Sequence, residues 1–283
     1  FLLISSIIFL IILRKKGMKF FMKILGIDTS SKRCTTCILE DNNVIAELHS
    51  DDEKTHSQTL MPLIDKMFTK TNLTLNDIDL LACSIGPGSF TGVRIGISTA
   101  KAFADVYNFK TVGISSLEGL AYNIKNDISL LNINVICSLI DAKNENVYYG
   151  LFDKNYNMLE ELSTCSINEL IDKLKKFNTS IALVGDGAIA YRNKLEQSLG
   201  QDLSNSTEID LNNSLEVSST LSTYFFEEEK NLASSISIAR FAYNKYVNSN
   251  GTTKDYNSSL SPMYLRKSQA ERSLEEKQER QGE

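Results

Sequence analysis

Two histidines are the only imidazole side chains that this sequence offers for chemistry, and their spacing excludes most uses. His49 and His56 are seven residues apart, which on one helix would separate them by about 10 Å along the axis. Catalytic zinc commonly takes two or three histidines among its ligands. The sequence therefore argues against a zinc hydrolase and against a Ser–His triad built on a further histidine, and we expect His56 to make a capping or interface contact at a helix start.

Cys34 and Cys37 have the CxxC spacing of redox and metal sites. Residues three apart on a strand point to opposite faces, and no second CxxC or partnering histidine follows. We therefore interpret the pair as ordinary strand cysteines. The five cysteines are an odd, scattered set, which indicates a reducing compartment and so the cytoplasm.

Two turns follow buried apolar runs and could face a metal or a phosphate. Asp28 ends the run 23–28, and Asp141 ends the run 132–141. A turn that binds phosphate generally needs glycine, so that backbone N–H groups can converge on the anion. Neither 28–36 nor 141–147 contains glycine, which disfavours nucleotide binding by these turns, although Asp28 remains a cofactor-binding candidate.

The segment 86–96, GPGSFTGVRIG, is the most informative stretch. It joins a predicted strand to a predicted helix, where N–H groups and the helix dipole favour an anion, so Gly86 and Gly88 are cofactor-binding candidates. It matches neither GxGxxG nor GxxxxGK[ST]. The alternative is a tight turn into a close-packed helix: Gly92, Gly96 and Ala100 are four apart, and their smooth side suggests that another backbone approaches there.

These motifs lie among elements that the apolar pattern predicts. In the first half we expect strands at 23–28, 34–40, 43–48, 80–85 and 110–114 and helices at 56–70, 89–106 and 115–124. In the second half we expect strands at 132–141, 147–152, 181–184 and 263–266, helices at 168–176 and 233–246, a loop over 201–220 and a polar linker over 246–261. The halves repeat one order of elements, which predicts an α/β protein of two related lobes.

Composition fits a globular chain that binds neither nucleic acid nor an anionic membrane by itself. The 283 residues are 42% apolar and 23% charged, with a net charge of −5. The opening run FLLISSIIFLIIL is shorter than the roughly 20 residues of a membrane span, and its basic residues follow it, unlike those of a secretory signal. We expect 1–21 to be foreign to the protein; without them four basic residues are lost and the net charge becomes −9.

Six segments occur in an order that resembles the TsaB (YeaZ) family of bacterial proteins, over nearly all of 22–283. They are GIDTS (26–30), HSQTLMPLI (56–64), GPGSFTGVRIGISTAKAFA (86–104), SSLEGL (115–120), VGDGA (184–188) and PMYLRKSQAE (262–271). The glycine-rich segment is long and specific. The resemblance implies the two-lobed actin-like, sugar-kinase-like, Hsp70-like ATPase fold with duplicated βββαβα lobes: an N-terminal lobe over 22–128, a C-terminal lobe over 129–262, and a strand with a charged tail over 263–283.

The resemblance also implies a function. It is the synthesis of threonylcarbamoyladenosine beside the anticodon of tRNAs that read A-starting codons, with this chain as a non-catalytic, activating subunit. The implied partners are a catalytic TsaD-like paralogue and a TsaE-like ATPase, which would carry the metal and ATP or ADP, and tRNA would be reached only through the complex. Self-association of this chain when its partner is absent stays open.

The paralogue carries a metal-binding histidine pair four residues apart, and the matching positions here are Ser116 and Leu120. A hydroxyl is a weak ligand and an isobutyl group is none, so we expect no metal and no catalytic residue in this chain. The resemblance places the partner-binding face on the helices at 56–70 and 89–106. The candidate interface residues are His56, Leu60, Leu63, Ile64, Met67, Gly92, Gly96 and Ala100. The alternative is that these stripes pack on their own sheet.

Two other functions are weighed against this one. An autonomous ATPase or kinase of the same fold would place Mg²⁺ with Asp28 or Asp141, and the glycine-free turns count against it. A metallopeptidase, which older glycoprotease-like labels for the superfamily suggest, lacks the histidine pair that it would need.

Overall fold

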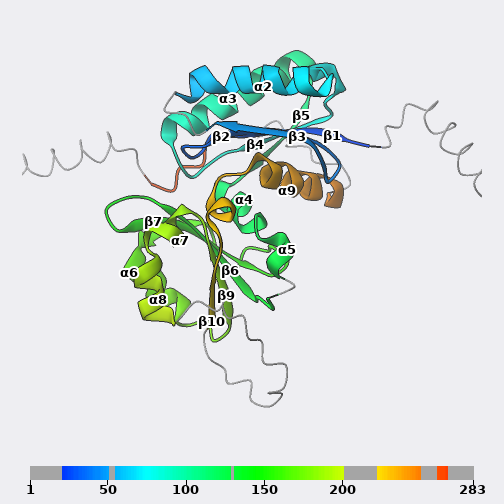
Figure 1. Cartoon of the computed structure of the whole chain (residues 1–283). Helices are drawn as coiled ribbons and strands as arrows, with labels where there is room; N and C mark the ends of the chain where they lie inside the picture. Colours follow the sequence, from blue (N-terminus) through cyan, green and yellow to red (C-terminus); the bar gives the residue numbers. More distant parts are fainter. Residues whose placement is uncertain (1–20, 51–54, 129–130, 201–221, 250–259, 267–283) are drawn as a thin grey trace, which may run out of the picture.

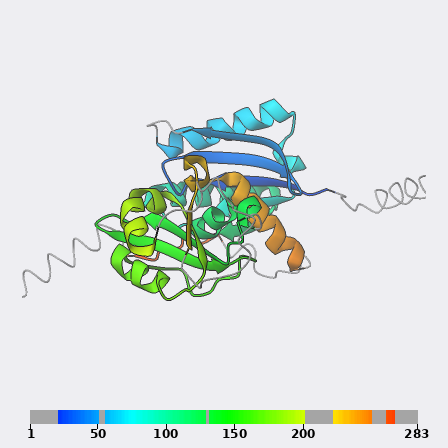
Figure 2. The same ribbon diagram turned by 60° about the horizontal axis from the view of Figure 1, so that its bottom comes forward.

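A computed structural model describes residues 21–50, 55–128, 131–200, 222–249 and 260–266. It has two lobes, each built on a five-stranded mixed sheet (Figure 1), and the second lobe lies beside the first in both views (Figure 2). Four predictions lie wholly or partly outside the described residues: the foreign segment 1–21 except for Phe21, the loop over 201–220, the linker over 250–259 and the charged tail over 267–283. Among the described residues, no helix is both long enough and apolar enough to cross a bilayer.

The sheet of the first lobe has the order β3-β2-β1-β4-β5. Its first three strands form an antiparallel meander, and the last two run parallel to β1. The strands are β1 (Lys23–Asp28), β2 (Cys34–Glu40), β3 (Asn43–Ser50), β4 (Leu80–Ser84) and β5 (Lys110–Ile114). Helices α2 (His56–Thr71) and α3 (Phe90–Tyr107) cover one face, and a short helix η1 (Leu75–Asp77) precedes β4.

The second lobe repeats this plan with the order β10-β9-β6-β7-β8, as the sequence predicted. Its strands are β6 (Val135–Asp141), β7 (Asn146–Asp153), β8 (Ser163–Ser166), β9 (Ser180–Val184) and β10 (Ser222–Phe225). Its helices are α6 (Ile167–Leu174), α7 (Asp186–Ala190), α8 (Arg192–Leu199) and η2 (Glu228–Asn231). Helices α4 (Ser116–Tyr122) and α5 (Lys125–Ile128) connect the lobes and pack on the other face of this sheet.

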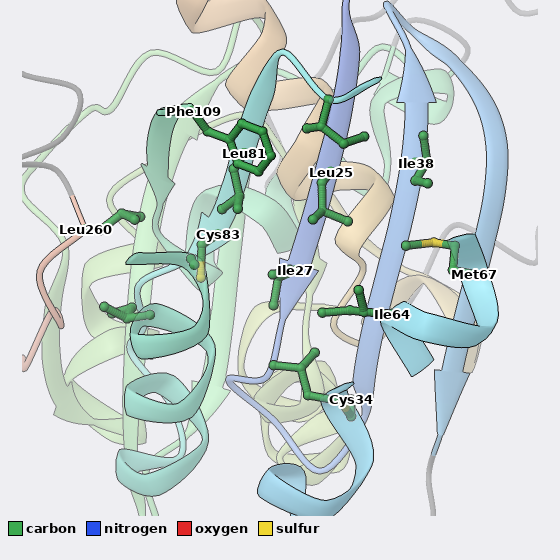
Figure 3. Packing of buried hydrophobic residues seen from close by; sticks show 14 of the residues in the cluster. Leu25, Ile27, Cys34, Ile38, Ile64, Met67, Leu81, Cys83, Phe109 and Leu260 are labelled. Carbon is green, nitrogen blue, oxygen red and sulfur yellow. The ribbon is translucent and has the colours of Figure 1, made fainter. Parts of the chain in front are cut away.

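The core of the first lobe follows from strand alternation. Leu25 and Ile27 of β1 point towards α2 and α3, where they meet Ile64 and Met67 (Figure 3), while Ile24 points to the opposite face. The two CxxC cysteines also divide as predicted: Cys34 lies in the first cluster and Cys37 in the opposite one. Burial raises the pKa of both thiols to about 12, so neither is a thiolate near neutral pH.

Helix α9 (Ser235–Asn248) belongs by sequence to the predicted second lobe but packs on the first sheet. Its buried residues Ile238, Ala239 and Ala242 cover the face that α2 and α3 leave open. Gly26 allows the close approach, because a Cβ there would lie 2.6 Å from the Ser235 carbonyl oxygen. The predicted strand at 263–266 is wrong: this segment is irregular and ends in a bend, and the Met263 N–H donates to the Ile85 carbonyl oxygen (2.7 Å).

Candidate functional site

The glycine-rich segment leaves the end of β4, passes a turn and forms the first half of α3. Gly86 and Gly88 have φ values of 96° and 155°, which glycine adopts without strain. Ser89 caps α3 by accepting a hydrogen bond from the Gly92 N–H (3.1 Å). Helix α3 thus begins at a capped turn that lies against residues 28–31, which we call the first turn.

One side of this segment is packed against that first turn. A Cβ would lie 2.1 Å from the Ser30 carbonyl oxygen if added to Gly88, and 2.0 Å from the Thr29 carbonyl oxygen if added to Gly92. The Thr29 hydroxyl donates to the Gly92 carbonyl (2.7 Å), and the Ser89 N–H donates to the Ser30 carbonyl (2.7 Å). The glycine spacing predicted that another backbone approaches this helix. That backbone is residues 29–30 of the same chain.

Gly86 also faces the chain's own backbone. A Cβ there would lie 3.0 Å from the Met263 carbonyl oxygen. The sequence predicted Gly86 and Gly88 as cofactor-binding candidates, and in the structure both allow close packing of segments of this chain. A phosphate at either position would have to displace Met263 or Ser30.

The first turn is closed around Asp28, which is 2% exposed. Its carboxylate accepts hydrogen bonds from the Ser30 N–H (2.9 Å) and the Ser30 hydroxyl (2.7 Å). Burial raises the pKa of Asp28 against the effect of these donors. In a phosphate-binding turn the backbone N–H groups face the phosphate, whereas the Ser30 N–H donates to the Asp28 carboxylate here. This turn therefore does not fit a nucleotide phosphate.

His56 lies over the same turn. Its Nε2 donates to the Ser31 carbonyl (2.7 Å), and its ring lies beside Gly92, where a Cβ would come within 2.8 Å of Cδ2. The contact at the helix start is therefore intramolecular. It holds α2, α3 and the first turn together, and the partly buried His56 stays a predicted interface residue.

The second of the two turns, which joins β6 to β7, is also closed by hydrogen bonds within the chain. Asp141 accepts from the Lys143 N–H (2.9 Å) and the Tyr191 hydroxyl (3.2 Å) and pairs with the Lys143 ammonium (2.5 Å). Desolvation opposes ionisation of Asp141, but the hydrogen bonds from Lys143 outweigh it and lower the pKa. Lys143 and the next two residues have left-handed backbones, with φ of 65°, 53° and 57°.

Ser116 and Leu120, the positions that match the paralogue's histidines, lie on α4 and are buried. The Ser116 hydroxyl lies 2.9 Å from that of Ser84. Glu118, between them, accepts from the Ser115 N–H (2.9 Å) and pairs with Lys245 (2.7 Å). These side chains serve packing and helix capping, and the described residues contain no group of three His, Cys, Asp or Glu that could hold a metal ion.

Six of the eight predicted interface residues are buried within their own lobe, as the alternative of packing on their own sheet would have them. They are Leu60, Ile64, Met67, Gly92, Gly96 and Ala100. The reason is geometric: an apolar stripe at helical spacing faces the sheet first. Leu63 is half-buried.

The solvent-facing sides of α2 and α3 carry apolar residues that the sequence analysis missed. Met61 is 48% exposed, Val106 76% and Tyr107 38%. Pro62 and Ala102 are also exposed. We call these five residues the outer helical face. The sequence did offer a signal for these residues: each is an apolar side chain at a position where the helical period predicts exposure to solvent.

Adding a methyl group at Gly92 tests the close approach. We expect Gly92→Ala to lower the free energy of unfolding by about 3 kcal/mol, because the new Cβ overlaps the Thr29 carbonyl. Ser98→Ala, at an exposed position of the same helix, should change it by less than about 0.5 kcal/mol. Urea unfolding measures both, and equal stability of the two variants would contradict this packing.

The raised pKa of Asp28 gives a pH dependence with a definite sign. A carboxyl with a raised pKa in the folded state binds its proton more tightly there than in the unfolded chain. Its contribution therefore lowers stability as the pH rises above the ordinary aspartate value of about 3.9. Asp28→Asn removes this titration while an amide oxygen still accepts from Ser30.

Unfolding free energies measured between about pH 4 and pH 8 should therefore shift in favour of Asp28→Asn as the pH rises. Ser31→Ala, in the same turn, is the control and should follow the wild-type profile. A difference between Asp28→Asn and wild type that does not change with pH would contradict the raised pKa.

This chain is similar to known proteins in sequence and in fold. The family model "TsaD: tRNA N6-adenosine threonylcarbamoyltransferase" matches residues 44–274. The tRNA threonylcarbamoyladenosine biosynthesis protein TsaB of Buchnera aphidicola (subsp. Schizaphis graminum) is 34% identical over 168 residues, which cover 58% of this chain and 78% of that protein. TsaB of Escherichia coli K12 is 30% identical, covering 60% and 74%.

Solved structures show the fold. YeaZ from Pseudomonas aeruginosa superimposes with a TM-score of 0.60 at 18% identity, covering 86% of this chain and all of that one. A second Pseudomonas aeruginosa structure, of a protein with similarity to peptidase YEAZ, gives 0.63 at 17% identity, covering 87% and 100%. The predicted two-lobed, actin-like ATPase fold is confirmed. The chain therefore belongs to the TsaB (YeaZ) family, a branch of the TsaD-related proteins.

Proposed function

We propose that this chain is a non-catalytic, activating subunit in the attachment of threonylcarbamoyl to the adenosine beside the anticodon of tRNAs that read A-starting codons. Membership of the TsaB family supports a role in tRNA threonylcarbamoyladenosine biosynthesis. The observation that carries the non-catalytic role is the closed first turn. Asp28, Thr29 and Ser30 are at most 5% exposed and are bonded to their own chain.

The residues at the paralogue's metal positions support the same proposal. Ser116 is occupied by its contact with Ser84, and Leu120 has no donor atom. A neutral imidazole at each position would be needed to rebuild the ligand pair. Metal and ATP chemistry would then reside in a TsaD-like catalytic subunit and a TsaE-like ATPase, and the acidic chain would meet tRNA through that complex.

The outer helical face is the surface that we assign to the TsaD-like partner. The support for this assignment is that large apolar side chains are exposed on both helices, as on protein interfaces. Helices α2 and α3 contact one another on the side of the first sheet that lies away from the second lobe (Figure 1). Met61 and Val106 can therefore face a partner while the buried stripes hold both helices on the sheet.

The experiment on the proposal is a transfer assay with threonylcarbamoyl-AMP and tRNA. The isolated chain should give no modified tRNA, and adding it to the TsaD-like and TsaE-like subunits should activate transfer. Modification of tRNA by the isolated chain would overturn the non-catalytic role. Metal analysis of the purified chain checks the metallopeptidase alternative, which requires a bound divalent ion.

A pair of matched valine variants tests the interface. Val106→Asp places a charge on the outer helical face, whereas Val247→Asp places it on an exposed site of α9. We expect Val106→Asp to weaken binding to the TsaD-like subunit by at least about tenfold, because desolvating a charge at an interface core is costly. Val247→Asp should bind as wild type does. Titration calorimetry measures both affinities, and equal affinity of the two variants would rule out this surface.

A further inference from the structure

Residues 260–266, which we call the strap, contact both lobes. In Figure 1 the strap is the red segment that lies between α3 and the second lobe. It begins at Leu260, which is 1% exposed and belongs to the core of the first lobe beside Cys83 (Figure 3). Met263 then donates its N–H to the Ile85 carbonyl, just beyond the end of β4.

The middle of the strap is fixed to α3 through an aromatic stack. The Tyr264 ring lies on the Phe90 ring with centroids 4.7 Å apart and planes 9° apart. Arg94, one helical turn further on, donates from Nε to the Tyr264 hydroxyl (2.7 Å). Gly86, Phe90 and Arg94 thus hold the strap, while Gly88, Gly92 and Gly96 contact the first turn, so the motif uses alternate positions for two segments of the chain.

The end of the strap reaches the second lobe. Arg266 donates from a terminal guanidinium nitrogen to the Ala142 carbonyl (3.1 Å), in the turn between β6 and β7. This is a charge-assisted hydrogen bond to the same turn that Asp141 and Lys143 stabilise.

A second tie crosses between the lobes at the first turn. Arg33, whose side chain is only 12% exposed, makes a bidentate pair with Glu229 of η2, with N–O distances of 2.6 and 3.4 Å. Helix η2 is in turn held to the second lobe, because the Asn231 Oδ1 accepts from the Gly185 N–H (2.7 Å). The turn after β6 is therefore bonded to the strap, which the first lobe holds. Arg33, just after the first turn, is bonded to η2, which the second lobe holds.

We propose that the strap and the Arg33–Glu229 pair form a latch that keeps the two lobes at one separation. Two-domain proteins close around ligands by hinge or shear motion, and bonds that cross between the domains oppose that motion. Here the two ties add to the packing of α4 on α9, which includes the Lys245–Glu118 ion pair (2.7 Å). The Tyr122–Tyr156–Phe241 ring cluster lies between α4, the segment after β7 and α9, with centroids 4.9 to 6.3 Å apart. The latch goes beyond the proposed function, since it concerns the isolated chain and needs no partner.

Distances between spin labels on the two lobes test the latch in the full chain. Lys101→Cys on α3 and Asp172→Cys on α6 supply exposed labelling sites, in a Cys165→Ser background, because the other four cysteines are buried. The latched chain should give one narrow distance distribution. We expect Arg266→Ala combined with Arg33→Ala to broaden it and to shift its mean by more than about 2 Å.

Arg240→Ala is the matched control, because that guanidinium also contacts a carbonyl, of Asn42, but within the first lobe. Tyr264→Phe, which keeps the ring stack, should retain the wild-type distribution, whereas Tyr264→Ala should broaden it. If Tyr264→Ala does not fold, the arginine variants carry the test. A wild-type distribution in the Arg266→Ala, Arg33→Ala double variant would overturn the latch, and it would leave the transfer and binding assays unaffected.

Discussion

The contact between the glycine side of α3 and the first turn is the constraint on which the rest of the structure depends. Gly88 and Gly92 bring the helix so close that Thr29 and Ser30 bond to its backbone. The turn is thereby buried, and Asp28 is enclosed by its own donors. In an ATPase of this fold the same place would have to stay open for phosphate. Close packing and an open phosphate site cannot coexist here, because both need the same space.

The remaining features are consequences of that closure. Arg33, two residues after the first turn, pairs across the lobes with Glu229. Of the two positions that match the paralogue's metal ligands, Ser116 contacts the Ser84 hydroxyl (2.9 Å) and Leu120 is buried. Under the proposed function, these internal bonds take the place of catalytic chemistry, and the outer helical face is the surface that we assign to a partner.

The sequence predicts much of the local structure, because local pattern determines it. Strands β1, β2 and β5 have the predicted bounds, and the glycine spacing correctly indicated a close backbone. Strands β8 and β10 were missed because their four residues are too few to show a period, and helix α8 was missed as well. Helix α9 crosses to the first lobe through long-range packing, which no local pattern encodes. Periodicity also located the apolar stripe with Leu60 and Ile64. It could not decide whether the stripe packs on its own sheet or on a partner protein, and both residues are buried in this lobe.

Binding of Mg-ATP to the isolated chain, measured by titration calorimetry, tests the central claim most directly. The closed first turn predicts no measurable heat of binding, and the same result for wild type and Asp28→Ala. Tight binding that Asp28→Ala abolishes would contradict it, because the turn would then open to admit phosphate and metal.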